Sequence, residues 1–302
     1  MVTGKNYIGN ELCAAGNVTF TTFDPILNSA NKSIHTEASS AEINAAVELA
    51  NDALKVYRDM SGKRKAEFLN AIADEIMELG DAMISVYMRE SGLPEGRAKG
   101  ERGRTMGQLR VFAALIEEGS WVEARIDTEN LNRSPIPKVD IRKMNMAIGP
   151  IVVFGASNFP LAYSTAGGDT ASALAAGCPV IVKAHPMHAG TSEMVASAII
   201  KAAQKTGMPN GVFSNLNSKG IEVGVMLAEH PGVKGIGFTG SINGGRALYD
   251  IAAKRNEPIP VFAEMGSINP VVLMPSYLAK NGDDIAKTYA GSITLGTGQF
   301  CT

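Results

Sequence analysis

From Ile148 onward, the chain alternates between short apolar runs and segments of helical pattern. The apolar runs are IVVFGA, PVIVKA, GVFSNL and VKGIGFTG, and a fifth run, PVFAEMG, follows them. Between the runs lie TAGGDTASALAAG, TSEMVASAIIKAAQKTG, GIEVGVMLAEH and NGGRALYDIAAKR, which are helical in pattern. This alternation predicts βαβ units and a buried parallel sheet with helices on both faces. The predicted fold class is therefore α/β.

The first third of the chain is predicted to be helical. Ser39 and Glu42 have the spacing of a capping box. A later helix ends at Gly80, and Asp81 is then expected to cap the next one. The basic run GRAKGERGR is broken by Glu101, so we expect a solvated helix face there.

The segment from Trp121 to Met146 has a different pattern. Apolar and polar residues alternate in WVEARIDTEN and KVDIRKMNM, on either side of RSPIP. This pattern predicts exposed antiparallel strands with a proline-stiffened connection. Since long two-faced ribbons seldom stand alone in water, we expect this one to pair with another subunit.

The composition argues against several classes of partner. The net charge of −2 over 302 residues gives no electrostatic case for nucleic acid or an anionic membrane. No apolar run has the length of a bilayer span, and the start has no signal-peptide core. Three cysteines are too few for a disulfide framework and favour a reducing, cytoplasmic compartment. His185 and His188 form H-x-x-H without the rest of a zinc-site pattern, so no metal is expected.

Three candidate reactive side chains lie in loops that follow predicted strands or glycine-rich stretches. Asn158 follows the first strand, where an asparagine either caps a turn or donates to a developing oxyanion. Glu264 ends the last strand, as either a surface residue or a general base. Cys301 lies in GTGQFCT, outside any apolar run, where a cysteine can serve as a thiolate nucleophile. Since ligands of parallel sheets bind beyond the carboxyl ends of the strands, the strand-end loops are where chemistry is expected.

The turn FTGSINGG ends a strand and opens a helix. Its glycines, Gly240 and Gly245, allow either a plain tight turn or a turn whose N–H groups face an anion. Arg246 and Ala247 do not fit the end of a P-loop, and the dinucleotide pattern G-x-G-x-x-G is not matched. GASNFP is not a hydrolase elbow, because Phe159 occupies the position of its last glycine.

Together, these loops resemble the aldehyde dehydrogenase superfamily. SNFP is similar to the family's W-N-F-P, KAHP to its K-P-x-E, and FTGSINGG to its F-T-G-S-x-x-x-G. FAEMGSINP is similar to L-E-L-G-G-K-N-P and GQFCT to G-Q-x-C, in the same order over nearly the whole chain. KAHPMHAGTSE most resembles the branch that oxidises 2-oxoglutarate semialdehyde (2,5-dioxovalerate). A medium- or long-chain fatty aldehyde dehydrogenase is the alternative within the family.

The resemblance implies a role for each candidate residue. Cys301 matches the nucleophile that attacks the aldehyde, and Glu264 matches the base that activates water to hydrolyse the resulting thioester. The Asn158 amide and the Cys301 N–H would stabilise the alkoxide. The implied cofactor is NADP or NAD, held by Ser157, Lys183, His185, Pro186, Gly220, Gly240, Ser241 and Gly245.

This sequence departs from the family pattern at several of these positions. Ser157 replaces the usual tryptophan, and Met265, Ser267 and Ile268 alter the stretch after Glu264. Pro186 stands where many NAD-preferring members have a glutamate that binds the ribose hydroxyls. A carboxylate there would repel the 2′-phosphate of NADP at short range. Its absence, with Lys183 close by, predicts that the protein accepts or prefers NADP.

The resemblance also implies a division of the chain. Residues 1–124 and 148–263 would form a Rossmann-like cofactor-binding domain, and residues 125–147 an oligomerisation ribbon of a homodimer or homotetramer. Residues 264–302 would begin a second α/β catalytic domain. Family chains run well beyond the nucleophile, so we expect the 302-residue polypeptide alone to be inactive.

Two hypotheses from other classes stay open at this point. A cysteine hydrolase or acyltransferase could use Cys301 and Glu264 without a nicotinamide, but it would leave the anion-binding turn without a purpose. A non-catalytic scaffold would have no need for a Cys301 more reactive than Cys13 or Cys178.

Overall fold

The computed structural model describes residues 2–298, 300 and 301, so Gln299 and Thr302 of the GQFCT motif lie outside the described residues. Its centre is a seven-stranded sheet in the order β11-β10-β7-β8-β9-β1-β2. The five predicted apolar runs form its parallel strands: β7 (Ile151–Phe154), β8 (Val180–Lys183), β9 (Phe213–Leu216), β10 (Gly235–Gly240) and β11 (Val261–Met265). The predicted α/β class with a parallel sheet is confirmed.

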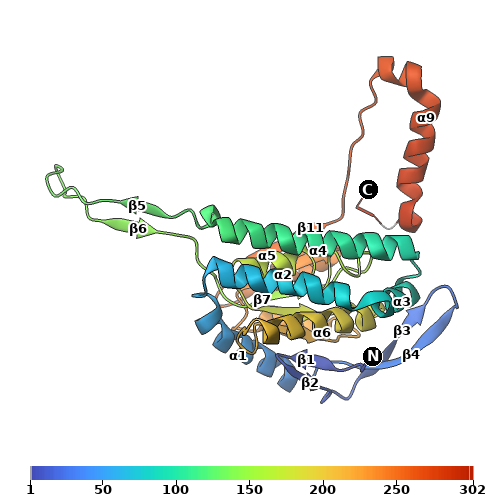
Figure 1. The fold of residues 1–302 in the computed structure, drawn as a ribbon, viewed down its shortest axis with the longest axis horizontal. Coiled ribbons are helices and arrows are strands. Elements are labelled where there is room, and N and C mark those ends of the chain that lie inside the picture. The colour runs from blue at the N-terminus through green and yellow to red at the C-terminus, as the bar shows by residue number, and fades with distance from the viewer. Residues whose placement is uncertain (1, 299, 302) are drawn as a thin grey trace.

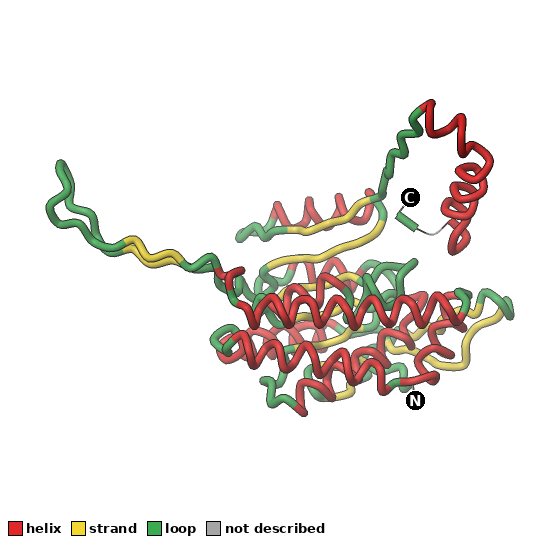
Figure 2. The backbone as a smooth tube through the Cα atoms, turned by 45° about the horizontal axis from the view of Figure 1, so that its top comes forward, coloured by secondary structure: helices red, strands yellow, loops and turns green. Residues whose placement is uncertain are grey.

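Helices cover both faces of this sheet (Figures 1 and 2). Val153 and Val182 point into one core, whereas their neighbours Val152 and Ile181 point into the other. The strands are therefore buried on both faces, which explains their continuous apolar pattern. The first core is closed by α2 (Gly62–Glu78), α3 (Gly80–Ser91), α4 (Glu95–Glu118), α5 (Gly168–Ala175) and α6 (Ala189–Lys205), and the second by α1 (Ser40–Tyr57), α7 (Glu222–Glu229) and α8 (Ile242–Lys254).

The prediction of helix throughout the first third is wrong for its first 36 residues. These residues form four strands: β1 (Asn6–Ile8), β2 (Glu11–Cys13), β3 (Thr19–Asp24) and β4 (Ser29–Thr36). β1 adds antiparallel to β9, with Tyr7 opposite Asn215, and β2 extends the edge further. Gly9 makes the tight turn between them at φ 53°, a backbone conformation that favours glycine. β3 and β4 form a separate hairpin.

The predicted ribbon is present as a thin arm. β5 (Arg125–Asp127) and β6 (Ile141–Lys143) pair antiparallel, and a single bridge joins Asn130 to Lys138 further out. The arm projects from the body and leaves Ile126, Ile136 and Ile141 exposed (Figure 1). A second projection consists of α9 (Pro275–Thr294), which leads through a short 3₁₀ turn (Leu295–Gly298) back towards the body (Figures 1 and 2).

The N-terminal helices test three local predictions made from the sequence. The capping box is confirmed: Ser39 Oγ accepts from Glu42 N–H at 3.3 Å, and Glu42 Oε2 accepts from Ser39 N–H at 2.8 Å. Asp81 is not a cap, because α3 begins at Gly80 and Asp81 lies in its first turn. The run at residues 96–104 is mostly exposed on α4, as predicted, but Glu101 within it is only 4% exposed. Its carboxylate is held there by hydrogen bonds described below.

Candidate active site

A cavity of about 340 Å³ lies at the carboxyl ends of three neighbouring strands, β7, β10 and β11. Carboxyl ends of parallel strands meet at one edge of a sheet, so loops distant in sequence converge there. The cavity brings together Asn158, Glu264 and Cys301, the three side chains predicted to carry chemistry. Its walls are completed by Ser157, Thr239, Gly240, Ser241, Gly266, Ser267 and Phe300.

Cys301 is held at the cavity by the loop that follows β11. Its backbone carbonyl accepts hydrogen bonds from Ser267 Oγ at 2.6 Å and from the Asn269 amide. This loop therefore ties the cysteine to the strand that carries Glu264. Sequence reasoning treated Ser267 only as a departure from a motif and missed its contact with Cys301. No signal in the sequence near Ser267 could have revealed a partner 34 residues away.

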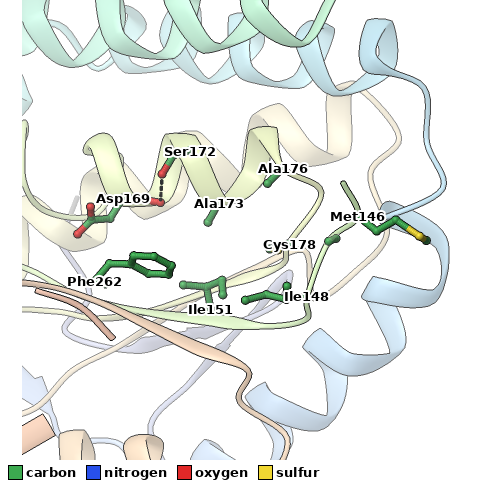
Figure 3. Close-up of a pocket in the computed structure, with 11 residues that line it drawn as sticks. Met146, Ile148, Ile151, Asp169, Ser172, Ala173, Ala176, Cys178 and Phe262 are labelled. Atoms are coloured by element: carbon green, nitrogen blue, oxygen red, sulfur yellow. Dashed lines mark hydrogen bonds between the residues drawn. The ribbon is translucent and has the colours of Figure 1, made fainter. Parts of the chain in front are cut away.

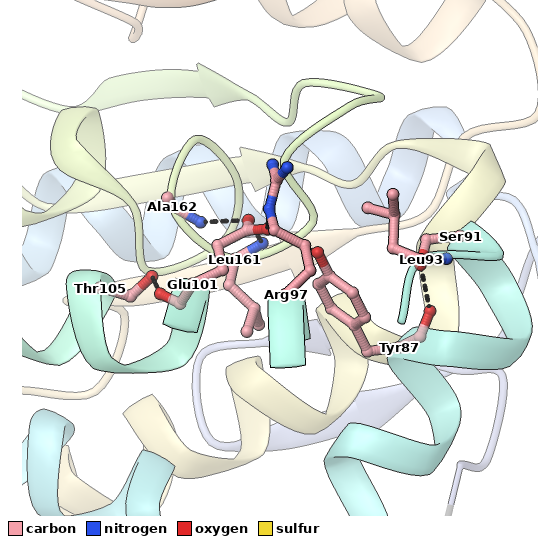
Figure 4. A network of polar contacts seen from close by, with 8 residues as sticks. All are labelled: Tyr87, Ser91, Leu93, Arg97, Glu101, Thr105, Leu161 and Ala162. Carbon is pink, nitrogen blue, oxygen red and sulfur yellow. Dashed lines mark hydrogen bonds and ion pairs between the residues drawn. The ribbon is translucent and has the colours of Figure 1, made fainter. Parts of the chain in front are cut away.

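The loop that carries Asn158 continues to Leu161 and Ala162, which contact Glu101 of α4 (Figure 4). Glu101 Oε1 accepts from Leu161 N–H at 2.8 Å and from Ala162 N–H at 2.9 Å. Tyr87 Oη donates to Glu101 Oε2 at 2.6 Å. Burial, and then the Glu101 charge, raise the pKa of Tyr87, so its hydroxyl stays a donor. The Asn158 loop is thus fixed by a buried carboxylate more than fifty residues earlier in the chain.

The N-terminus of α8 faces the same cavity. Ser241 is the N-cap, and its Oγ accepts from Gly244 N–H at 3.1 Å. A helix N-terminus has unpaired N–H groups and a partial positive charge, which suit a phosphate. Gly245 does not line the cavity. A Cβ on it would lie 2.4 Å from Met265 Cγ, so this glycine allows α8 to pack closely against β11.

The remaining predicted cofactor residues lie at the ends of β8 and β9, next to β7 in the sheet. Lys183 is half-buried; burial lowers its pKa, and the nearby Glu37 opposes this. Burial, helped by the charges of His188 and Lys183, lowers the pKa of His185 to about 3, so this ring is neutral at pH 7. Pro186 begins the 3₁₀ turn Pro186–His188.

Gly220 lies in the loop after β9, where its N–H donates to Glu37 Oε2 at 3.3 Å. The same carboxylate oxygen accepts from Lys219 N–H at 2.5 Å. Glu37 therefore fixes this loop, a role that sequence reasoning missed because its partners lie 182 and 183 residues away.

A smaller cavity lies beside the larger one. It has a volume of about 150 Å³ and shares Ser157 and Asn158 with the larger one. Its other wall includes Met187 and His188, directly after Pro186. The two cavities therefore meet at the Asn158 loop, between the α8 N-terminus and the 3₁₀ turn that follows β8.

Another cavity, of about 270 Å³, opens on the sheet face beside α5 (Figure 3). It is lined mainly by apolar groups, among them Ile148, Ile151 and Phe262. Cys178 contributes to it, but burial raises the pKa of this thiol, which makes it a poor nucleophile. The cavity thus offers no second reactive cysteine.

The parallel sheet and its strand-end cavity define a Rossmann-like α/β fold with an enzyme-type site. The chain belongs to the aldehyde dehydrogenase family, because the model of that family (Aldedh) matches residues 14–302.

Two curated relatives cover the chain almost completely. It is 53% identical over 302 residues to alpha-ketoglutaric semialdehyde dehydrogenase 2 of Azospirillum brasilense, which is 100% of this chain and 58% of the relative. It is 44% identical over 299 residues to alpha-ketoglutaric semialdehyde dehydrogenase of Acinetobacter baylyi, covering 99% of this chain and 56% of the relative. The chain thus spans a little over half the length of these relatives.

The fold is shared with solved structures. An aldehyde dehydrogenase C mutant from Pseudomonas syringae, in complex with NAD+ and octanal, superimposes with a TM-score of 0.81 at 21% identity. The match covers 100% of this chain and 57% of that one. In the described part of the chain, no helix combines the length and the apolar character needed to cross a membrane. The same residues contain no group of three or more His, Cys, Asp or Glu side chains able to hold a metal ion.

Proposed function

We propose that this chain is the cofactor-binding and nucleophile-bearing part of an NAD(P)-dependent aldehyde dehydrogenase. The substrate we propose is 2-oxoglutarate semialdehyde, which the enzyme oxidises to 2-oxoglutarate. The observation that carries the proposal is the single cavity lined by Asn158, Glu264 and Cys301. The identities of 53% and 44% to two alpha-ketoglutaric semialdehyde dehydrogenases support the choice of substrate.

In this proposal the three side chains act in sequence. The Cys301 thiolate attacks the aldehyde carbon to form a thiohemiacetal, whose oxyanion accepts from the Asn158 amide and the Cys301 N–H. After hydride loss, the thioester is hydrolysed by a water molecule that Glu264 deprotonates. Glu264 is exposed on its strand end, which leaves room for that water.

The residues along the sheet edge fit a dinucleotide. NAD(P)+ would supply the hydride acceptor. The α8 N-terminus with Gly240 and Ser241 offers N–H groups for the pyrophosphate, and Lys183 offers a cation at the end of β8. The residues that would hold the cofactor are Ser157, Lys183, His185, Pro186, Gly220, Gly240 and Ser241, and Gly245 would act indirectly by letting α8 pack against β11. With proline at position 186 we expect NADP to be accepted, and comparing kcat/KM for NADP and NAD tests this.

The reaction is tested by substitutions in the full-length protein. Cys301→Ser is expected to lower NAD(P)H formation from 2-oxoglutarate semialdehyde by at least about a thousandfold. Glu264→Gln is expected to keep a first-turnover burst of NAD(P)H while slowing steady-state turnover, because only thioester hydrolysis is impaired. Cys13→Ser is the matched control, since Cys13 lies on β2, outside the cavity. Unchanged activity of Cys301→Ser would refute the proposal.

The domain division and the assembly are also part of the proposal. Residues 1–124 and 148–263 form the cofactor-binding domain, residues 125–147 an oligomerisation ribbon, and residues 264–302 the start of the catalytic domain. The exposed isoleucines of the β5–β6 arm support a role in a homodimer or homotetramer. We place the protein in the cytoplasm, because Cys13, Cys178 and Cys301 are all free thiols.

A further inference from the structure

Arg97 lies close to the candidate active site without lining the cavity described above. It projects from α4, and its side chain is 17% exposed. The guanidinium carbon lies 4.4 Å from the ring centroid of Phe159 and 4.3 Å from that of Phe300. The two rings also contact each other edge to face, with centroids 5.3 Å apart. Phe159 directly follows Asn158, and Phe300 directly precedes Cys301 and lines the cavity, so the guanidinium contacts part of the cavity wall from behind.

The polar neighbours of Arg97 leave part of its hydrogen-bonding capacity unused. Its Nε lies 3.5 Å from Glu101 Oε2, and its guanidinium also interacts with the Tyr87 hydroxyl. Glu101 already accepts from two backbone N–H groups and from the Tyr87 hydroxyl, so its charge is compensated without Arg97 (Figure 4). Arg97 Nη2 is buried and has no hydrogen-bond partner among the described residues. Leaving a buried donor of a charged group unpaired is costly, so such a group marks a place where an acceptor is expected.

We propose that Arg97 binds the carboxylate of the aldehyde substrate. This inference rests on the proposed function and adds to it the group that selects an anionic aldehyde. The planar guanidinium fork matches a carboxylate, and a lysine would not reproduce that geometry. The rings of Phe159 and Phe300 provide an apolar wall for the short carbon chain between the aldehyde and the carboxylate. An uncharged aldehyde of the same length gains nothing from Arg97.

The neighbouring Arg104 is a weaker candidate. It lies seven residues further along α4 and is exposed. Its Nη2 already donates to the Tyr163 hydroxyl, and its guanidinium carbon is 6.0 Å from the Phe159 ring centroid. Arg97 is closer to Phe159, contacts Phe300 as well, and has the unpaired donor.

The experiment compares two aldehydes in the full-length protein. The kcat/KM values for 2-oxoglutarate semialdehyde and for pentanal are measured for the wild type, Arg97→Met, Arg97→Lys and Arg110→Met. Arg110 is the matched control, because it lies on the same helix but is exposed and pairs with Asp74. We expect Arg97→Met to lower the semialdehyde-to-pentanal ratio of kcat/KM by about 10- to 100-fold, mainly through KM. Arg97→Lys is expected to lie between it and the wild type.

A second measurement guards against misfolding of the methionine variant. Inhibition of pentanal oxidation by glutarate, a dicarboxylate without an aldehyde, should weaken in Arg97→Met and Arg97→Lys but not in Arg110→Met. The inference would be overturned if the semialdehyde-to-pentanal ratio of kcat/KM were unchanged in both Arg97 variants. It would also be overturned if kcat/KM fell equally for both aldehydes while glutarate inhibition stayed the same. If the wild type oxidises pentanal but not the semialdehyde, the proposed substrate is wrong and the inference falls with it.

Discussion

Glu101 provides a quantitative test of how the Asn158 loop is held. In Glu101→Ala, the N–H groups of Leu161 and Ala162 and the hydroxyl of Tyr87 all lose their acceptor. Each buried donor left unpaired costs about 1–3 kcal/mol. Since the loop can relax and admit water, we expect values near the lower end, and about 3–5 kcal/mol of unfolding free energy in total.

Glu101→Gln separates the charge from the hydrogen bonds. The glutamine Oε1 can still accept from the two backbone N–H groups, and the tyrosine hydroxyl can accept from the amide. What is lost is the charge of the acceptor and the acceptor of the Tyr87 O–H, while both backbone hydrogen bonds remain, so we expect a smaller cost of about 1–2 kcal/mol. Glu117→Ala on the same helix is the matched control, because Glu117 is exposed, and surface changes usually stay within about 0.5 kcal/mol.

Urea unfolding of the full-length protein measures the three variants, and amide hydrogen exchange locates the effect. The expected order of destabilisation is Glu101→Ala, then Glu101→Gln, then Glu117→Ala. Amide protection at Leu161 and Ala162 should fall in Glu101→Ala, because both N–H groups lose their acceptor. If Glu101→Ala unfolded at the same urea concentration as Glu117→Ala, the buried carboxylate would not hold this loop.

Three further predictions concern other parts of the fold. Gly245→Ala should lower the free energy of unfolding by about 1–3 kcal/mol, because the new Cβ would lie 2.4 Å from Met265. Thermal melts measure this loss, and Gly103→Ala is the control, because a Cβ at that position meets nothing within 4 Å. Burial lowers the pKa of His35 to about 4, so between about pH 4 and pH 6.5 the unfolded state binds more protons than the folded state. The free energy of unfolding should therefore fall as the pH drops through this range. Urea titrations of His35→Phe should show a smaller fall. Under the proposed pairing of subunits through the β5–β6 arm, replacing Ile126 and Ile141 by serine should give a smaller mass in light scattering. The melting temperature of the subunit should not fall, since both side chains are exposed.

The parallel strands could be predicted because their signal is local. Each is a continuous apolar run, since both of its faces are buried, and each is followed by a segment of helical period. β1 and β2 have only three residues each, and β1 is fixed by pairing with β9 more than 200 residues later. Too few residues remain in such short strands to display an alternation, so the pattern around them did not predict strand.

The burial of Glu101 illustrates a different limit. Within GRAKGERGR it is one charge among several, and helical spacing alone does not say which of them faces the body. Its burial is decided by the backbone N–H groups of Leu161 and Ala162, about sixty residues further on, which donate to its carboxylate. A run of charged residues therefore predicts a solvated helix face, but it does not show which carboxylate a distant loop will bury.

The site could be predicted as a set of loops, but not as a geometry. Strand-end loops share an edge of a parallel sheet, so Asn158 and Glu264 were expected there. The sequence does not give the strand order, in which β10 alone separates β7, which precedes Asn158, from β11, which carries Glu264. Nor does it predict that Ser267 and Asn269 hold the carbonyl of Cys301, or that Arg97 lies over Phe300. These contacts join segments that only the assembled sheet brings together.

Glu101 is one of several buried carboxylates that hold distant backbone in the same way. Glu90 on α3 accepts from the N–H groups of Gly190 and Thr191 at the start of α6. Glu193 on α6 accepts from those of Thr3 and Gly4 at 2.7 and 2.8 Å. Each carboxylate accepts from backbone N–H groups distant in the sequence, most of them buried, and its own charge is stabilised in return. The N-terminal helices thus do more than cover the sheet, because they fix the loops and helix ends that follow its strands. In the proposed mechanism, the rigidity that Asn158 would need to face a developing oxyanion therefore comes from α4, a helix that contributes no residue to the 340 Å³ cavity.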